Sequence, residues 1–135
     1  MATSSKIRFN TIQFLCAIFA IIGLHSLVGW QWALIVPLVY AYFLPSESYQ
    51  ECALQMLCAY LVLFVASYSL APEETARMLE SLAVIIARNA GRGFGWALPV
   101  ISLLFAALMG FLAGVVGSGL RLMLRNVHKF ESGII

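Results

Sequence analysis

The sequence predicts an all-α integral membrane protein, a four-transmembrane-helix bundle with an amphipathic interfacial helix between helices three and four. Hydrophobic residues make up 62% of the chain, and charged residues only 10%, whereas an average soluble domain has about 25% charged residues. A soluble chain of this size has no means of hiding so much apolar surface, because small domains bury only about two-thirds of their surface. The eight basic and six acidic residues also leave three long uncharged spans.

The uncharged spans set the expected number of crossings. They cover residues 9–46, 52–72 and 93–120. A helix needs about 20 apolar residues to cross a hydrocarbon core of roughly 30 Å, so the second and third spans each fit one crossing. The first span has 38 residues and would be about 57 Å long as a single helix. We therefore expect the first span to fold back on itself.

The fold-back is expected near the middle of the first span, where residues 29–32 read GWQW. Glycine favours a turn, and tryptophan prefers the membrane–water interface. This predicts helix one over residues 10–28 and helix two over residues 31–44. Helix two is short and contains Pro37, which favours a kink, so a re-entrant segment is the alternative to a full crossing. Helix one is expected to be retained as a signal-anchor-like segment, because no convincing cleavage pattern follows it.

Helices three and four are predicted over residues 52–70 and 98–125, and the whole chain, residues 1–135, forms a single transmembrane domain. Residues 72–92 connect them and begin with Pro72 and an acidic pair, which suit the first turn of a helix. Apolar side chains recur in this connector at steps of three and four residues, which is typical of an amphipathic helix in the interface plane. These side chains are Met78, Leu79, Leu82, Ile85 and Ile86, and Thr75 precedes them at the same spacing.

Basic residues at both ends of the chain predict the topology. Lys6 and Arg8 precede helix one, while Arg121, Arg125 and Lys129 follow helix four. Positive flanks favour the cytoplasm-like side of a membrane, so both termini are expected on that side. This requires an even number of crossings, and four satisfies it.

The same four-crossing topology makes a prediction for the aromatic residues. It places Trp30, Trp32 and Trp96 together at the opposite interface, where indole rings are favoured. Agreement between the charge pattern and this aromatic belt would support full crossings by both of the first two helices.

Small residues recur every four positions along helix four. Such a repeat lets helix backbones approach closely, which drives association in a membrane. It predicts tight helix packing and leaves three neighbours open: another helix of the same chain, a second copy, or a different subunit. The residues are Ser102, Ala106, Gly110, Gly114 and Ser118.

A few other side chains are candidates for binding. His25 lies within helix one, where an intramembrane histidine can contact a haem or pigment, although a hydrogen-bonded packing role is the simpler interpretation. No cofactor is otherwise predicted, and a bound lipid, quinone or pigment stays open. Arg88 and Arg92, near the end of the connector, are candidate contacts for lipid headgroups or an acidic partner.

Catalysis and ion coupling are not predicted. No carboxylate lies inside any predicted crossing, whereas coupled transport usually needs an ionisable group at membrane depth. The sequence also lacks the histidine, serine and paired-carboxylate motifs of common enzymes. The net charge of only +2 gives no indication of nucleic-acid binding. We therefore expect a non-enzymatic protein.

These features predict a structural or accessory subunit of a larger membrane complex, with membrane lipids and other transmembrane subunits or copies of itself as partners. A homo-oligomeric pore, including a holin-like one, is the alternative. A lipid, quinone or pigment binder is a further alternative, with His25 as the contact. The pore would be lined by the serines of helix four or by Gln55, Tyr60, Ser67 and Ser69 of helix three.

Overall fold

Every element of the part of the chain that the structure describes is a helix, which confirms the all-α prediction. The computed structural model describes residues 3–43, 48–86 and 94–131. The elements are α1 (Thr3–Leu27), α2 (Trp30–Ala33), α3 (Ile35–Phe43), α4 (Ser48–Leu70), α5 (Pro72–Ile86), the 3₁₀ turn η1 (Phe94–Trp96) and α6 (Ala97–Glu131).

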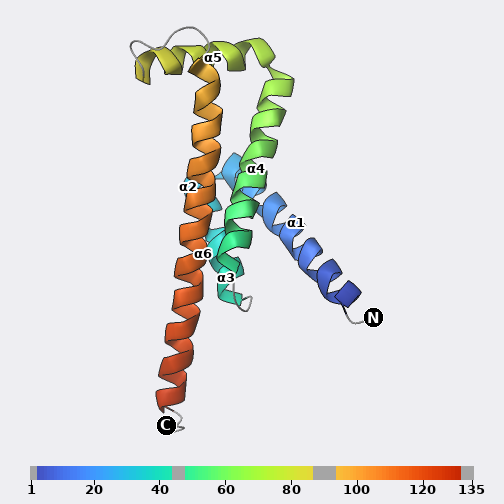
Figure 1. Cartoon of the computed structure of the whole chain (residues 1–135), viewed down its shortest axis with the longest axis vertical. Helices are drawn as coiled ribbons and strands as arrows, with labels where there is room; N and C mark the ends of the chain where they lie inside the picture. The colour runs from blue at the N-terminus through green and yellow to red at the C-terminus, as the bar shows by residue number, and fades with distance from the viewer. Residues whose placement is uncertain (1–2, 44–47, 87–93, 132–135) are drawn as a thin grey trace.

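Helices α4 and α6 form a long antiparallel pair, and α5 crosses their upper end (Figure 1). By length and composition, two helices of the described chain are able to cross a membrane, over Tyr49–Leu70 and Ala97–His128. The first of these segments has 22 residues and is therefore about 33 Å long, close to the roughly 30 Å of a hydrocarbon core. The predicted helices three and four thus coincide with the two candidate spans.

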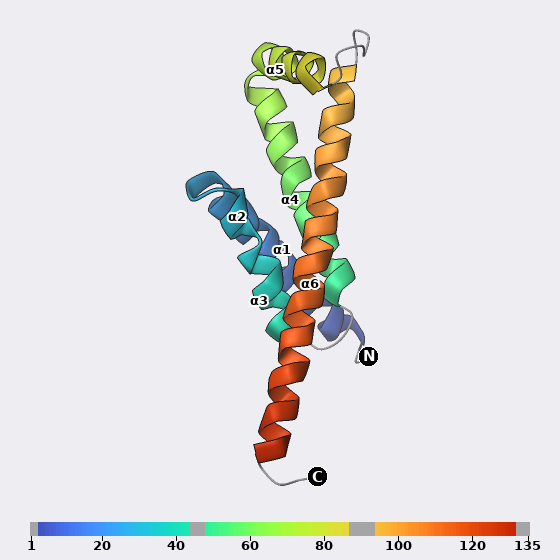
Figure 2. The same ribbon diagram turned by 90° about the vertical axis from the view of Figure 1, so that its left-hand side faces the viewer.

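The first uncharged span folds back, as expected, but its two arms are short. The apolar stretches are Thr11–Leu27 and Trp30–Phe43, with helical lengths of about 26 and 21 Å. Figure 1 shows their turn, at α2, well below α5, and Figure 2 shows it at the height of the middle of the α4–α6 pair but set apart from that pair. The four-crossing bundle is therefore not confirmed. The physical reason is length: two crossings need about 40 apolar residues besides the turn, and this span has 38.

The predicted helix over residues 31–44 is interrupted at Leu34, which separates α2 from α3. Pro37 has no backbone N–H, so it cannot donate to the carbonyl of Ala33 four residues earlier. Gly29 makes the preceding turn with a φ of +119°, a value that residues with a side chain rarely adopt. The turn and the kink therefore lie where the sequence predicted them. The segment from α2 to α3 is nevertheless shorter than a membrane crossing.

The tryptophans do not form the single belt that four crossings would require. Trp96 packs against Tyr68 at the α5 end, with ring centroids 5.5 Å apart, whereas Trp30 and Trp32 lie on α2 at a lower level (Figure 1). The predicted grouping of all three at one interface is therefore not confirmed, because α2 lies below the α5 end of α4.

Helix boundaries also differ from the predicted ones at the polar ends. α4 begins at Ser48 rather than residue 52, and α6 continues to Glu131 rather than ending near residue 125. α1 begins at Thr3, ahead of the predicted start at residue 10. The uncharged spans mark the length that suits a membrane interior, whereas a helix continues through flanking polar residues as long as its backbone hydrogen bonds are made.

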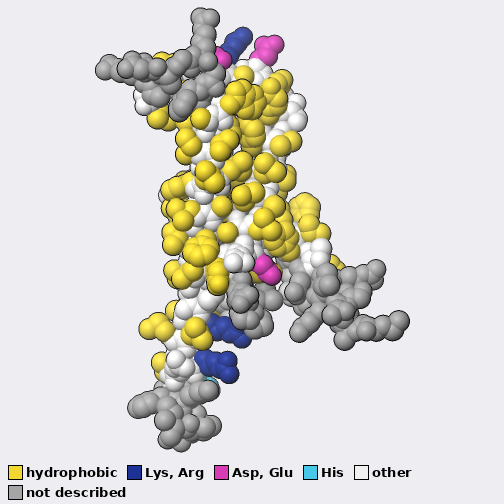
Figure 3. All heavy atoms as spheres, in the orientation of Figure 1, with side chains coloured by type: hydrophobic (Ala, Val, Ile, Leu, Met, Phe, Trp, Pro, Cys, Tyr) yellow, Lys and Arg dark blue, Asp and Glu magenta, His cyan; other side chains and the backbone are white. Residues whose placement is uncertain are grey.

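Charged side chains gather at the two ends of the described molecule (Figure 3). Lys and Arg side chains lie over the lower end of α6, and acidic and basic side chains lie on α5. From α5 down to the lower end of α4, where one acidic side chain is visible, hydrophobic side chains cover most of the face together with uncharged atoms. The buried core joins α1, α2 and α4 through Ile21, Ala33, Met56 and Ala59. Apolar side chains thus cover the outside of the α4–α6 pair as well as its interior.

Candidate functional site

The small residues that recur every four positions along α6, from Ser102 to Ser118, form a ridge on this helix. The centre of this small-residue ridge lies directly against α4. Gly110 and Gly114 are buried, and Ala106 is 5% exposed. A methyl group built on Gly110 would lie 2.5 Å from the carbonyl oxygen of Cys52, and one on Gly114 would lie 2.7 Å from the Cα atom of Tyr49. Only glycine, whose side chain is a single hydrogen atom, permits two backbones to approach this closely. The ridge therefore has α4 of the same chain as its neighbour.

The lower part of the ridge faces α3. A methyl group on Gly117 would collide with the backbone of Leu38 and the side chain of Ala41. Ser118 is half-buried, and its hydroxyl donates to the carbonyl of Gly114 at 2.8 Å. Gly119, by contrast, has open space around its Cα atom. The glycines of α6 thus divide into those pressed against the chain's own helices and one that faces outward.

His25 pairs with Tyr60 of α4. The Tyr60 hydroxyl lies 3.2 Å from Nδ1 of His25, and the two rings meet edge to face with centroids 5.1 Å apart. Which of the two groups donates depends on the imidazole tautomer. The sequence predicted a candidate contact at His25, but the choice of Tyr60 as its partner depends on the packing of α1 against α4.

Two cavities meet at this pair. One, of about 450 Å³, lies between the α1–α2 turn and the α4–α6 pair. The other, of about 560 Å³, lies under α5. Three polar residues line both cavities, namely His25, Tyr60 and Ser102. The rest of the first lining is apolar or aromatic: Trp30, Leu34, Met56, Ile101, Phe105, Ala106 and Met109. Ser102, the upper end of the predicted ridge, therefore faces a cavity rather than a closely packed helix.

A third hollow, of about 590 Å³, is a groove between α1 and α3. On the α1 side it is lined by Gln13, Cys16, Ala17 and Ala20. The Oε1 atom of Gln13 is buried and has no hydrogen-bond partner among the described residues. Sequence reasoning overlooked this groove. The signal that was available is the same as on α6: small residues at steps of three and four along one helix face.

A polar cluster joins the beginning of α4 to α3. The Tyr40 hydroxyl donates to Oε2 of Glu51 at 2.8 Å, and the Cys52 thiol donates to the carbonyl of Pro37 at 3.3 Å. Gln55 is fully buried beside Tyr40, but its amide makes no hydrogen bond of good geometry with a described residue. These contacts fix α3 on α4 at the level where the charged residues begin.

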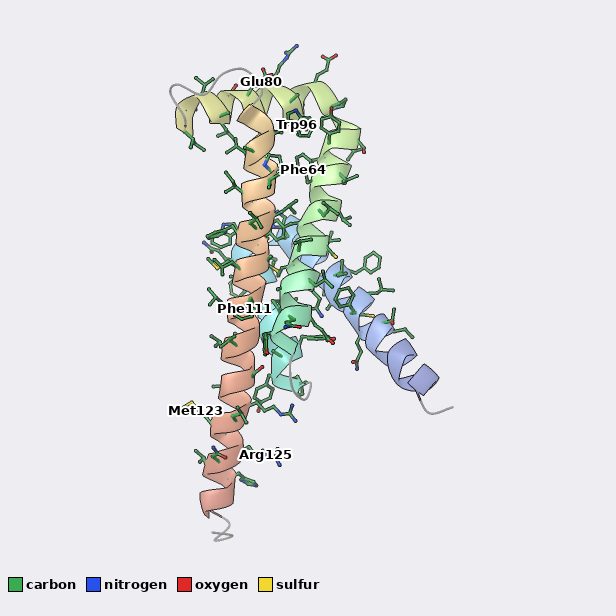
Figure 4. The ribbon with its side chains drawn as sticks, viewed as in Figure 1. Phe64, Glu80, Trp96, Phe111, Met123 and Arg125 are labelled. Atoms are coloured by element: carbon green, nitrogen blue, oxygen red, sulfur yellow. The ribbon has the colours of Figure 1, made fainter. Side chains whose placement is uncertain are left out.

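Helix α5 has the expected amphipathic character. Met78, Ile85 and Ile86 are 66%, 75% and 67% exposed, while Figure 4 shows Glu80 on the outer, upper side of the helix. Below α5, Phe64 of α4 and Trp96 point toward one another, with ring centroids 6.3 Å apart (Figure 4). Arg88 and Arg92, the predicted lipid or partner contacts, lie outside the described residues.

In the described ranges, no three His, Cys, Asp or Glu side chains are grouped so that they could hold a metal ion. The features that the fold brings together are instead a closely packed helix pair, a polar pair between two apolar cavities, and a groove on α1.

The fold and these features define a class: a helical protein with two helices long and apolar enough to span a membrane. Searches for a matching family, a similar curated protein and a similar solved structure found no match.

Proposed function

We propose that this chain is a non-enzymatic integral membrane protein that serves as an accessory subunit of a larger membrane complex. The observation that carries the proposal is the groove between α1 and α3, which is lined on its α1 side by the small residues Cys16, Ala17 and Ala20. Small residues on an outward helix face leave room for a second helix, and close approach of helices is what favours their association in a membrane.

The proposed arrangement in the membrane has two crossings, α4 and α6, with α5 in the interface at one side. The α1–α3 arm enters from the other side as a re-entrant hairpin. Irregular backbone such as the break at Leu34 is tolerated at membrane depth where protein covers it. Two crossings are an even number, so the basic flanks of both termini still lie on one, cytoplasm-like side. The predicted topology of the ends is thus kept with fewer crossings.

The partner is a transmembrane helix of another subunit. Cys16 and Ala20 are exposed, and a methyl group on Gly23, one turn further along α1, would meet no atom within 4 Å. Small exposed side chains allow a second helix to approach closely. The equivalent face of α6 is not free for this purpose, since Gly110 and Gly114 lie against α4.

A homo-oligomeric pore is the less favoured alternative. Of the residues expected to line it, Gln55 is fully buried within the chain and Tyr60 pairs with His25. The hydroxyls of Ser67 and Ser69 donate to carbonyls of their own helix at 2.9 and 2.8 Å. Side chains placed in this way do not offer one continuous polar face for a water-filled channel.

The docking proposal predicts that Ala20→Leu releases the chain from its complex. The larger side chain fills the groove that the partner helix needs, so we expect at least a tenfold drop in the share of chain that migrates as a large complex in native electrophoresis. The thermal stability of the isolated chain should stay unchanged, because Ala20 is exposed.

Ala66→Leu is the matched control, since Ala66 is also an exposed alanine but lies on α4. It should leave the complex intact. Equal behaviour of the two variants would contradict the groove as the docking site. Co-expression of two differently tagged copies tests the occupant: recovery of a complex that contains only this chain would overturn the accessory-subunit role.

A further inference from the structure

We infer that the paired cavities around His25 and Tyr60 form a binding site for a lipid-soluble carbonyl compound of the quinone type. This site uses different residues from the groove between α1 and α3, and it goes beyond a role in complex assembly. The inference depends on three properties of the cavities: their depth, their hydrogen-bond donors and their shape.

In the proposed two-crossing arrangement, the depth of the His25–Tyr60 pair does not suit a charged headgroup. His25 lies near the end of α1, and the adjoining α2 lies at the height of the middle of the α4–α6 pair rather than at the level of α5 (Figure 2). Charged lipid headgroups belong at the two interfaces. A ligand at this depth must therefore be largely apolar, with an uncharged polar group that matches the pair.

The His25–Tyr60 pair presents one donor to such a ligand in either tautomer. If Nδ1 carries the proton, it donates to the Tyr60 oxygen, and the tyrosine O–H is left to donate elsewhere. If Nδ1 accepts from Tyr60, then the N–H of Nε2 is left. The Ser102 hydroxyl also lines both cavities. The site therefore offers donors, and a carbonyl oxygen is the uncharged acceptor that fits them.

The remaining lining suits a flat ring with an apolar tail. Trp30 and Phe105 provide aromatic surfaces, and Met56 and Met109 provide adaptable apolar contacts. Each cavity falls within the roughly 300–1,000 Å³ typical of ligand sites, at about 450 and 560 Å³. We place the ring at the polar pair, with the second cavity, under α5, as room for the tail.

Titration with decyl-benzoquinone tests the inference. The full chain carrying Trp32→Phe and Trp96→Phe keeps Trp30 as its single tryptophan, and Trp30 lines the cavity. We expect saturable quenching of its fluorescence in detergent. Tyr60→Phe should weaken binding about five- to tenfold, because it removes either the hydroxyl that donates to the ligand or the hydrogen bond that holds the His25 imidazole in place. Tyr68→Phe, the same change on α4 away from both linings, should leave the affinity unchanged.

Competition with decylbenzene provides a second measurement, and this one does not require a change at Tyr60. Decylbenzene has a similar ring and tail but no carbonyl, so it should displace the quinone at least tenfold less effectively. Equal displacement by the two compounds, non-saturable quenching, or equal affinities of the Tyr60→Phe and Tyr68→Phe variants would each overturn the inference.

Discussion

Gly110→Ala is expected to lower the free energy of unfolding of the chain by about 1–3 kcal/mol, the usual range for overpacking a close contact. The added methyl group would lie 2.5 Å from the carbonyl oxygen of Cys52 and 2.8 Å from Cγ of Met56. The methionine side chain is able to move, but the carbonyl belongs to the backbone of α4, so the two helices must separate. Reversible unfolding in mixed micelles, followed by circular dichroism, measures the change.

Gly119→Ala is the matched control on the same helix, because open space surrounds its Cα atom. Alanine favours a helix over glycine by about 1 kcal/mol, so this variant should be as stable as the original chain or slightly more so. The higher helix propensity of alanine also applies at Gly110. A loss of stability in Gly110→Ala would therefore arise in spite of this gain, and it would have to come from the collision with α4. If Gly110→Ala were as stable as Gly119→Ala, the close packing of α6 on α4 would be contradicted.

Cysteine labelling is expected to distinguish a re-entrant α1–α3 arm from a pair of full crossings. The native residues Cys16, Cys52 and Cys58 are first replaced by alanine, and single cysteines are then placed at Trp32, Glu80 or Val127. In sealed vesicles, an impermeant maleimide should label Glu80→Cys on α5 from one side and Val127→Cys at the end of α6 from the other. Trp32→Cys should react at least tenfold more slowly from both sides. The reason is that α2 lies between the two charged ends of the molecule, at the level where hydrophobic side chains cover its surface (Figures 1 and 3).

Detergent provides the control for this measurement. Trp32 is 52% exposed, so Trp32→Cys should react readily once the bilayer is removed. Four full crossings make the opposite prediction, since they place residue 32 at the same interface as Glu80. Labelling of Trp32→Cys from the Glu80 side at a comparable rate would therefore contradict the re-entrant arm.

Local sequence patterns predicted the helices well but not their depth. The positions of Gly29 and Pro37 marked the turn and the kink correctly, because glycine permits a positive φ that other residues avoid, whereas proline lacks the backbone N–H that a continuous helix needs. The full crossings predicted for residues 10–28 and 31–44, with a re-entrant segment as the alternative for the second, are not confirmed. An apolar stretch shows that a segment avoids water. Whether it spans a membrane depends on its length and on the neighbours that cover its turn.

The candidate site was predicted only in part for a related reason. His25 was noticed because an intramembrane histidine is rare, but Tyr60 and Ser102 carry no distinctive pattern. They come together with His25 only because α1 packs across α4 beside α6. The groove on α1 was overlooked although its small residues follow the same spacing as those of α6. Spacing alone does not tell which of two helix faces with small residues packs against another helix of the same chain.

The sequence by itself determined the helical class of this protein, its charge-free spans, and the small-residue faces on which helices approach closely. These properties depend on composition and on periods of three to four residues, which are local. Only the tertiary structure decided that α6 uses its glycines on α4 and α3, that the α1–α3 arm stops at half height, and that His25 meets Tyr60. Each of these results depends on contacts between residues far apart in the chain, because the partner of a helix face is chosen by competition among all the faces that the fold brings near.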